Sequence, residues 1–169
     1  DDIVDNLERM IEGECLHLLL KERPFASDLR KISGILKLIS DLERLGDHAE
    51  DVLEFALKLK NTEKHSNEEV DKIVNVTLQM VKDSIEAYIK QDINLAQSVI
   101  DRDDLIDKMY DEVINDIIKL SDEKICTPSF AVYTTLVVKY IERMADHAVN
   151  IAKWVMYIIS GLHKDKKII

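Results

Sequence analysis

The chain has 169 residues, of which 46% are hydrophobic and 33% are charged, and its formal net charge is −10 at pH 7. This acidity argues against a nucleic-acid partner, because neutralising a phosphate backbone requires clustered lysine and arginine. No run of 18 apolar residues occurs in the sequence, which argues against direct insertion into a membrane. The two cysteines, Cys15 and Cys126, are too few for a disulfide framework and favour a reducing cytoplasm.

Long amphipathic helices are the structure that this composition favours, because aromatic residues are few and there are only 4 glycines and 2 prolines. Hydrophobic periodicity and helix-breaking residues predict helices at about 1–21, 27–59, 68–90, 93–121 and 129–160. We expect Asp92 to cap the fourth of these helices and the polar segment 60–67 to be a linker.

The second and fifth predicted helices carry the same apolar line, with alternating spacings of four and three residues. In the second helix the line runs through Ile35, Ile39, Leu42, Gly46, Ala49, Leu53 and Ala56. In the fifth it runs through Thr134, Val138, Ile141, Ala145, Ala148, Ala152, Val155 and Ile159. Such a line is typical of a helix that packs against its neighbours.

An internal repeat relates the two halves of the chain. The stretch DLERLGDHAEDV at 41–52 returns as YIERMADHAVNI at 140–151, which is 99 residues later. Upstream, DDIVDNLERMIE at 1–12 matches DDLIDKMYDEVI at 103–114 in its acidic and apolar spacing. Each half therefore has one helix with Asp-x-x-x-Asp and a longer helix with Glu-x-x-x-Asp. We predict an all-α fold of two tandem, similar three-helix bundles.

The first bundle is predicted to span residues 1–62 and the second residues 63–169. The second contains an additional helix, at 68–90, for which the first half of this sequence has no counterpart. The chain also starts without methionine and already in helical phase. We therefore expect the first bundle to be N-terminally incomplete, with its missing helix upstream of Asp1.

Pairs of carboxylates recur at helical spacing in both halves of the chain. The four pairs are Asp1 with Asp5, Glu43 with Asp47, Asp103 with Asp107, and Glu142 with Asp146. Like charges at this spacing repel by a few tenths of a kcal/mol, and they are costly to desolvate at a core edge without a counter-ion. A metal ion would compensate, and an all-oxygen donor set suits magnesium, manganese or iron rather than a structural zinc site.

Arginine and histidine accompany both copies of the motif. Arg44 and Arg143 follow the two glutamates and offer a different compensation, an internal salt-bridge network in a purely structural helical dimerisation module. His48 and His147 follow the two aspartates, about 100° further round each helix. If metal binds, we expect both arginines and both histidines to be supporting residues around the site, the histidines through hydrogen bonds rather than as metal ligands.

The sequence does not indicate an enzyme. A carboxylate-bridged metalloenzyme is the alternative function, but di-iron bundles use two Glu-x-x-His motifs, and only Glu14 with His17 fits that pattern here. The sequence has no glycine-rich phosphate loop and no local Ser/His/Asp grouping. We therefore expect no catalytic residues and no organic cofactor.

Taken together, the two Glu-Arg-x-x-Asp-His-Ala stretches, DDIVD, DDLID and ASDLRKI at 26–32 resemble the PhoU family of phosphate-transport accessory and regulatory proteins. The resemblance covers nearly the whole chain. It implies a cytoplasmic homodimer that can associate with the inner face of the membrane. It also implies a negative regulator of phosphate uptake and phosphate-starvation signalling, whose partners are subunits of the phosphate ABC transporter and a sensor histidine kinase.

The resemblance further implies a set of metal ligands. Carried over by position, they are Asp1, Asp5, Glu43 and Asp47 in the first half and Asp103, Asp107, Glu142 and Asp146 in the second. The metal that the family implies is iron in multinuclear clusters, with manganese, magnesium and zinc as the other expected ions. The second half lacks a counterpart of ASDLRKI, so any role of Asp28 and Arg30 belongs to the first half alone.

Overall fold

A computed structural model describes residues 2–22, 24–60, 68–163 and 166–167. Its helices are α1 (Asp2–Lys21), α2 (Ala26–Leu59), α3 (Glu68–Lys90), α4 (Ile93–Ile100), α5 (Asp103–Asp122) and α6 (Pro128–Ser160). After α6, β1 (Leu162–His163) pairs with β2 (Lys166–Lys167) as a two-residue antiparallel hairpin. The all-α class is confirmed. The predicted linker, apart from Lys60, lies outside the described residues.

The prediction of one continuous helix over 93–121 is wrong, because the chain turns at Asp101 and Arg102 between α4 and α5. Arg102 bonds the α3 carboxylate of Asp83, and its Nε donates to the Ser98 carbonyl. This anchoring offsets the backbone hydrogen bonds that a continuous helix would have made. At the other end of α4, Asp92 is the N-cap, as predicted.

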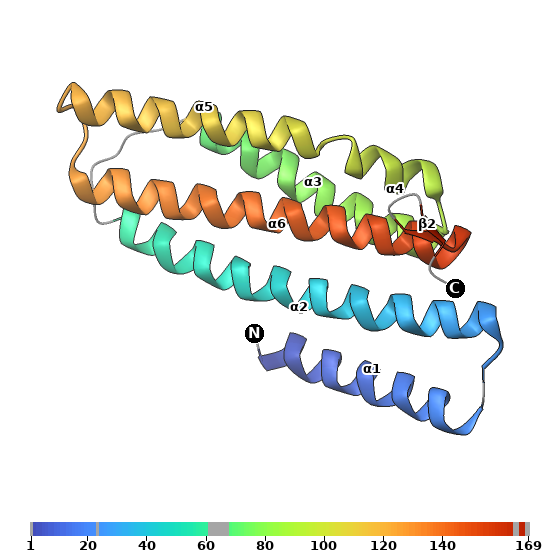
Figure 1. Cartoon of the computed structure of the whole chain (residues 1–169). Helices are drawn as coiled ribbons and strands as arrows, with labels where there is room; N and C mark the ends of the chain where they lie inside the picture. Colours follow the sequence, from blue (N-terminus) through green and yellow to red (C-terminus); the bar gives the residue numbers. More distant parts are fainter. Residues whose placement is uncertain (1, 23, 61–67, 164–165, 168–169) are drawn as a thin grey trace.

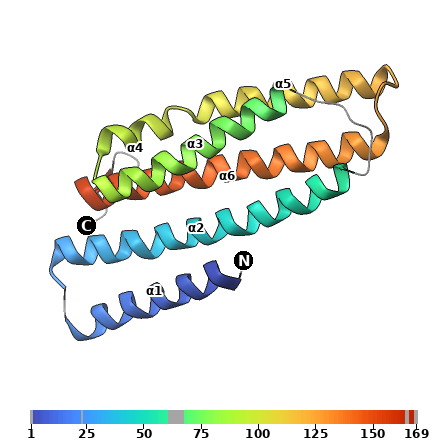
Figure 2. The ribbon, with the colours of Figure 1, turned by 180° about the vertical axis from the view of Figure 1, so that it is seen from behind.

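Helices α2 and α6 lie side by side in opposite directions and form the centre of the molecule (Figure 1). Helix α1 packs on α2, while α3, α4 and α5 pack on α6 and enclose it from the other side (Figure 2). The α2–α6 contact is tight: a β-carbon on Gly34 would overlap the side chain of Ile158. Arg30 crosses the same interface, and its Nε donates to the Ile158 carbonyl over 3.4 Å.

The apolar line predicted for α6 is buried up to Val155, with Val138, Ala148 and Val155 fully inside the core, and its last residue, Ile159, is partly exposed. The equivalent line in α2 is buried only in part, since Ala49, Leu53 and Ala56 are exposed. The described part of α1 starts at Asp2 and covers only the first half of α2 (Figure 1). The second half of α2 therefore buries mainly the side chains that point to α6.

In the second half of the chain, α3, α5 and α6 contact one another and form a three-helix bundle, with α4 continuing α5 along α6. In the first half, α1 contacts α2 and leaves apolar side chains such as Ile3, Leu7 and Met10 exposed. The division at residues 62 and 63 and the helix expected upstream of Asp1 stay predictions. Among the described residues, no helix is long and apolar enough to cross a bilayer.

Candidate functional site

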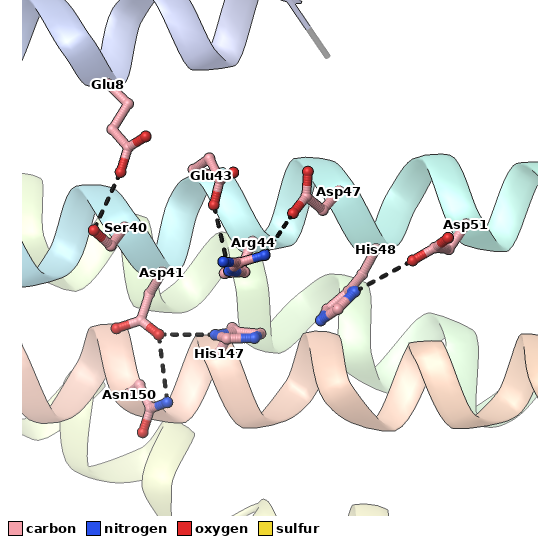
Figure 3. Close-up of polar contacts among 10 residues, drawn as sticks. All are labelled: Glu8, Ser40, Asp41, Glu43, Arg44, Asp47, His48, Asp51, His147 and Asn150. Atoms are coloured by element: carbon pink, nitrogen blue, oxygen red, sulfur yellow. Dashed lines mark hydrogen bonds and ion pairs between the residues drawn. The ribbon is translucent and has the colours of Figure 1, made fainter.

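The two copies of the repeated motif face each other across the α2–α6 interface (Figure 3). The rings of His48 and His147 have centroids 5.3 Å apart, and His48 also lies 5.5 Å from Tyr140. His147 of α6 in turn contacts α2, where its Nδ1 lies 2.8 Å from Oδ1 of Asp41. Because residues 41 and 140 are equivalent in the repeat, each histidine meets the same position of the opposite helix.

His48 is 9% exposed, and its Nδ1 is buried without a hydrogen-bond partner in the described part of the chain. Oδ2 of Asp51 lies 3.6 Å from this nitrogen, which is too far for a hydrogen bond. Burial lowers the pKa of His48, and the neighbouring His147 and Arg143 lower it further. Both imidazoles therefore belong to the α2–α6 interface in this structure, and the metal-supporting role expected for them stays a prediction.

A first cluster of carboxylates joins α1 to α2. Burial raises the pKa of Glu43 above its ordinary value, and the negative charge of Asp47 adds to this rise. Glu8 and Asp5, which come from α1, raise this pKa further. Oδ1 of Asp5 is buried and lacks a hydrogen-bond partner within the described residues. The fourth predicted ligand of this half, Asp1, lies outside the described residues.

Arg44 partly neutralises this first cluster. Its Nη1 lies 2.9 Å from Oδ2 of Asp47, and its Nε lies 3.5 Å from Oε2 of Glu43 (Figure 3). The Arg44 side chain is 59% exposed, so solvent screens both ion pairs. Its counterpart Arg143 is placed differently, with its guanidinium 5.8 Å from the centre of the Tyr140 ring. The two arginines therefore do not play equivalent roles in the two halves.

A second cluster joins α5 to α6 and contains Asp103, Asp107, Glu142 and Asp146. Burial raises the pKa of Asp103, and Asp107 and Glu142 add to the rise. Partial burial also raises the pKa of Asp146, followed by repulsion from Glu142 and Asp103. The four predicted ligands of the second half are thus close enough to repel one another. They hold negative charge that the folded chain leaves incompletely compensated.

Two lysines accompany the second cluster. Nζ of Lys139 lies 2.6 Å from Oε2 of Glu142 and forms an ion pair with it. Lys153 opposes the rise in the pKa of Asp103, as Lys139 does for Asp146. Both lysines are absent from the equivalent positions of the first half, which hold Ser40 and Glu54.

The donor chemistry of both clusters fits a hard or borderline cation, because each offers several carboxylates from two adjacent helices. In the described part of the chain, no three His, Cys, Asp or Glu side chains are placed to hold one ion between them. Binding would therefore require side-chain rotations that bring the carboxylate oxygens together. A bound cation would offset the burial and the mutual repulsion that raise the pKa of Glu43, Asp103 and Asp146. It would also give a partner to Oδ1 of Asp5, which has none within the described residues.

Sequence reasoning missed three residues at these sites. Glu8 follows Asp5 by three positions, and Lys139 precedes Glu142 by three, so helical spacing alone places each on the face of the predicted ligand. Asp41 carried no such signal, because its partner His147 is 106 residues away in the sequence.

The fold and the clusters define an all-α protein of tandem helical repeats that places paired carboxylates on adjacent helices of each repeat. The model of the PhoU domain family matches residues 1–56 and 70–155, which together are most of the chain. The chain therefore belongs to the PhoU family.

Similar proteins and structures agree with this assignment. A protein of Clostridium acetobutylicum named "Phosphate-specific transport system accessory protein PhoU homolog" is 34% identical over 98% of this chain and 76% of its own length. A Synechocystis protein of the same name is 38% identical, over 94% of this chain and 70% of that protein. The crystal structure of PhoU from Pseudomonas aeruginosa superposes with a TM-score of 0.90 at 32% identity, covering 96% of this chain and 78% of that one.

A second crystal structure, of the phosphate transport system regulatory protein PhoU from Streptococcus pneumoniae, has a TM-score of 0.89 at 28% identity. It covers 98% of this chain and 78% of that chain. The helical arrangement of this chain is therefore the arrangement of experimentally solved PhoU proteins.

Proposed function

We propose that this chain is an accessory and regulatory protein of phosphate transport, which represses phosphate uptake and phosphate-starvation signalling by docking on other proteins. The names of its relatives support this role, since they are called accessory or regulatory proteins rather than enzymes. Its partners are a subunit of the phosphate ABC transporter and a sensor histidine kinase. It acts in the cytoplasm as a homodimer, and it reaches the inner face of the membrane through these partners.

The observation that carries a metal-dependent mechanism is the pair of carboxylate clusters, each of which spans two helices. Asp1, Asp5, Glu43 and Asp47 would hold metal between α1 and α2. Asp103, Asp107, Glu142 and Asp146 would hold it between α5 and α6. Iron, as a multinuclear cluster, is the metal we propose, and manganese, magnesium and zinc are the other candidates. The bound cation would supply positive charge that offsets the repulsion among these carboxylates.

Each cluster brings together carboxylates from two helices. Glu43 and Asp5 come from different helices, as do Glu142 and Asp103, so drawing their oxygens together fixes one helix relative to the next. A fixed pair of helices presents one surface to a partner instead of several. Because a ligand shifts an equilibrium only through its different affinity for two states, the partner must bind the metal-fixed arrangement more tightly.

The test is partner binding by purified proteins, with the transporter ATPase subunit and the kinase cytoplasmic region from the same organism as probes. We expect the wild type to bind more tightly after iron loading than in chelator, and Glu142→Ala/Asp146→Ala to lose this gain. The matched control is Glu112→Ala/Asp116→Ala, an exposed acidic pair at the same spacing on α5. Equal partner binding by the wild type and Glu142→Ala/Asp146→Ala, with metal present, would contradict the metal-dependent mechanism.

A second candidate function is a structural helical dimerisation module that needs no metal. The ion pairs of Arg44 with Asp47 and Glu43 favour it, because they already supply a cation to the first cluster. This function predicts that no metal remains after dialysis and that Tm does not change when metal is added. Elemental analysis of protein purified without chelators or affinity metal distinguishes the two functions.

A further inference from the structure

One contact beside the carboxylates recurs in both halves with different residues. Position 40 in α2 is equivalent to position 139 in α6, and position 8 in α1 is equivalent to position 110 in α5. In the first half, Ser40 Oγ donates a hydrogen bond to Oε1 of Glu8 over 3.1 Å. In the second half, Nζ of Lys139 lies 5.3 Å from the ring centre of Tyr110. The structure thus pairs the same two positions in each repeat.

The contact carries a negative charge in the first half, on Glu8, and a positive charge in the second half, on Lys139. Glu8 adds a carboxylate to the first cluster, and its negative charge helps to raise the pKa of Glu43. Lys139 instead brings an ammonium group to the second cluster, 2.6 Å from Oε2 of Glu142. The Glu142 side chain is only 14% exposed, so this ion pair is better shielded from solvent than those of Arg44.

A cation inside the second cluster occupies an oxygen that a metal ion would need. For Glu142 to ligate metal through Oε2, it must first give up Lys139. Ligation through its other oxygen would still bring the metal close to the positive charge of the ammonium group. In the first cluster Arg44 pairs with Asp47 and Glu43, but its side chain is 59% exposed, so solvent weakens both pairs. Position 40 there is an uncharged serine, and Glu8 attracts a cation. The equivalent step therefore costs less in the first cluster. Ion binding at the two clusters therefore starts from different electrostatic states.

We propose that Lys139 is a built-in competitor of metal, which makes the second cluster the weaker of the two sites, and that Glu8 is an additional oxygen donor of the first. This proposal rests on the metal-dependent function proposed above. Its consequence is a response in two steps: the α1–α2 cluster fills at low metal concentration, and the α5–α6 cluster fills only when the concentration rises.

The experiment titrates Mn²⁺ into the full chain by calorimetry, with one cluster removed at a time. The second cluster is measured in the background Glu43→Ala/Asp47→Ala, and the first in the background Glu142→Ala/Asp146→Ala. In the first of these backgrounds we add Lys139→Ser, which installs the residue of the equivalent position. We expect its Kd for Mn²⁺ to fall about fivefold, the effect of removing one partly exposed ion pair.

Three further variants separate competition from a packing role. Lys139→Arg keeps the charge and should keep the Kd of the second cluster. Lys139→Met removes the charge but retains an apolar stem over Tyr110, so it should match Lys139→Ser, and it serves as the readout if that variant fails to fold. The reciprocal change, Ser40→Lys, should weaken Mn²⁺ binding at the first cluster by a similar factor, which a packing role of Lys139 does not predict.

The possible outcomes distinguish the competition by Lys139 from the metal-dependent function on which it rests. An unchanged Kd in both Lys139→Ser and Lys139→Met, while Mn²⁺ still binds, overturns the competition and leaves the metal-dependent function standing. Failure of Mn²⁺, and of Fe²⁺ under anaerobic conditions, to bind either cluster of the wild type overturns both. A second cluster that binds Mn²⁺ as tightly as the first also overturns the competition.

Discussion

Gly34 occupies a position in α2 where a side chain has no room. A β-carbon there would overlap Cγ1 of Ile158 and lie 2.9 Å from its Cδ1. We expect Gly34→Ala to lower the free energy of unfolding by about 1–3 kcal/mol, because overpacking forces neighbours off their preferred rotamers. Thermal unfolding would report this as a fall in Tm of about 2–4 °C per kcal/mol.

Gly13 is the matched control for that substitution. It lies within α1, and a β-carbon there would meet no atom within 4 Å. Gly13→Ala should therefore raise the free energy of unfolding by about 0.5–1 kcal/mol, since alanine loses less backbone entropy than glycine in a helix. If the two alanines changed Tm alike, the close approach of α2 and α6 at Gly34 would be contradicted.

Asp146 gives a prediction about pH. Partial burial and the charge of Glu142 raise its folded-state pKa above the unfolded value of 3.8, so the folded chain binds this proton more tightly. The metal-free protein should therefore lose stability as pH rises from 3.8 through the raised pKa. Asp146→Asn removes this loss, and we expect it to have a higher Tm than the wild type at pH 7 in chelator.

The same comparison at about pH 3.5 should show little difference between Asp146→Asn and the wild type, because the carboxyl is then largely protonated in both states. Asp116→Asn, at an exposed position on α5, serves as the control and should leave Tm within experimental error. A lower Tm for Asp146→Asn at pH 7 in chelator would mean that the fold stabilises the charged form of Asp146, which contradicts a raised pKa.

At the scale of elements, the short helix α4 depends on its cap. Its 8 residues are too few for a stable isolated helix, and the Asp92 carboxylate accepts hydrogen bonds from the amides of Asn94 and Leu95 at 2.9 and 3.0 Å. We expect Asp92→Ala to cost about 1 kcal/mol of stability. It should also speed amide exchange at Asn94 and Leu95.

Asp92→Asn should retain most of that stability, because asparagine is as good an N-cap as aspartate. Equal losses in Asp92→Ala and Asp92→Asn would show that the charge of Asp92, rather than the cap, matters. Arg102 anchors the other end of α4 independently, through Asp83 of α3. In Asp92→Ala, α4 should therefore fray from its first turn and not from its last.

At the scale of the whole molecule, α6 connects the two repeats. It contacts α2 over much of its length and also packs against α3, α4 and α5. We expect the chain to unfold in one cooperative transition, because neither repeat can lose its structure without exposing a face of α6 or α2. Calorimetric and van't Hoff enthalpies should then agree. Two resolved transitions would instead favour independent bundles divided near residues 62 and 63.

Much of this protein can be predicted from its sequence by itself. The all-α class, most helix limits, the cap at Asp92 and the repeat follow from local rules, because helical periodicity and breaking residues act over only a few positions. The same rules placed Glu43 with Asp47 and Glu142 with Asp146 on common helix faces. The motifs also predicted the family, which the comparisons confirm.

Only the tertiary structure decided which of those residues meet. His147 and Asp41 are 106 residues apart in sequence, and no local pattern pairs them. The break at Asp101 and Arg102 depends on Asp83 of another helix. Local spacing decides which side chains share a face, but neighbouring helices decide what that face contacts. That is the physical reason why the same position of two nearly identical motifs places Arg44 beside Asp47 but Arg143 beside the ring of Tyr140.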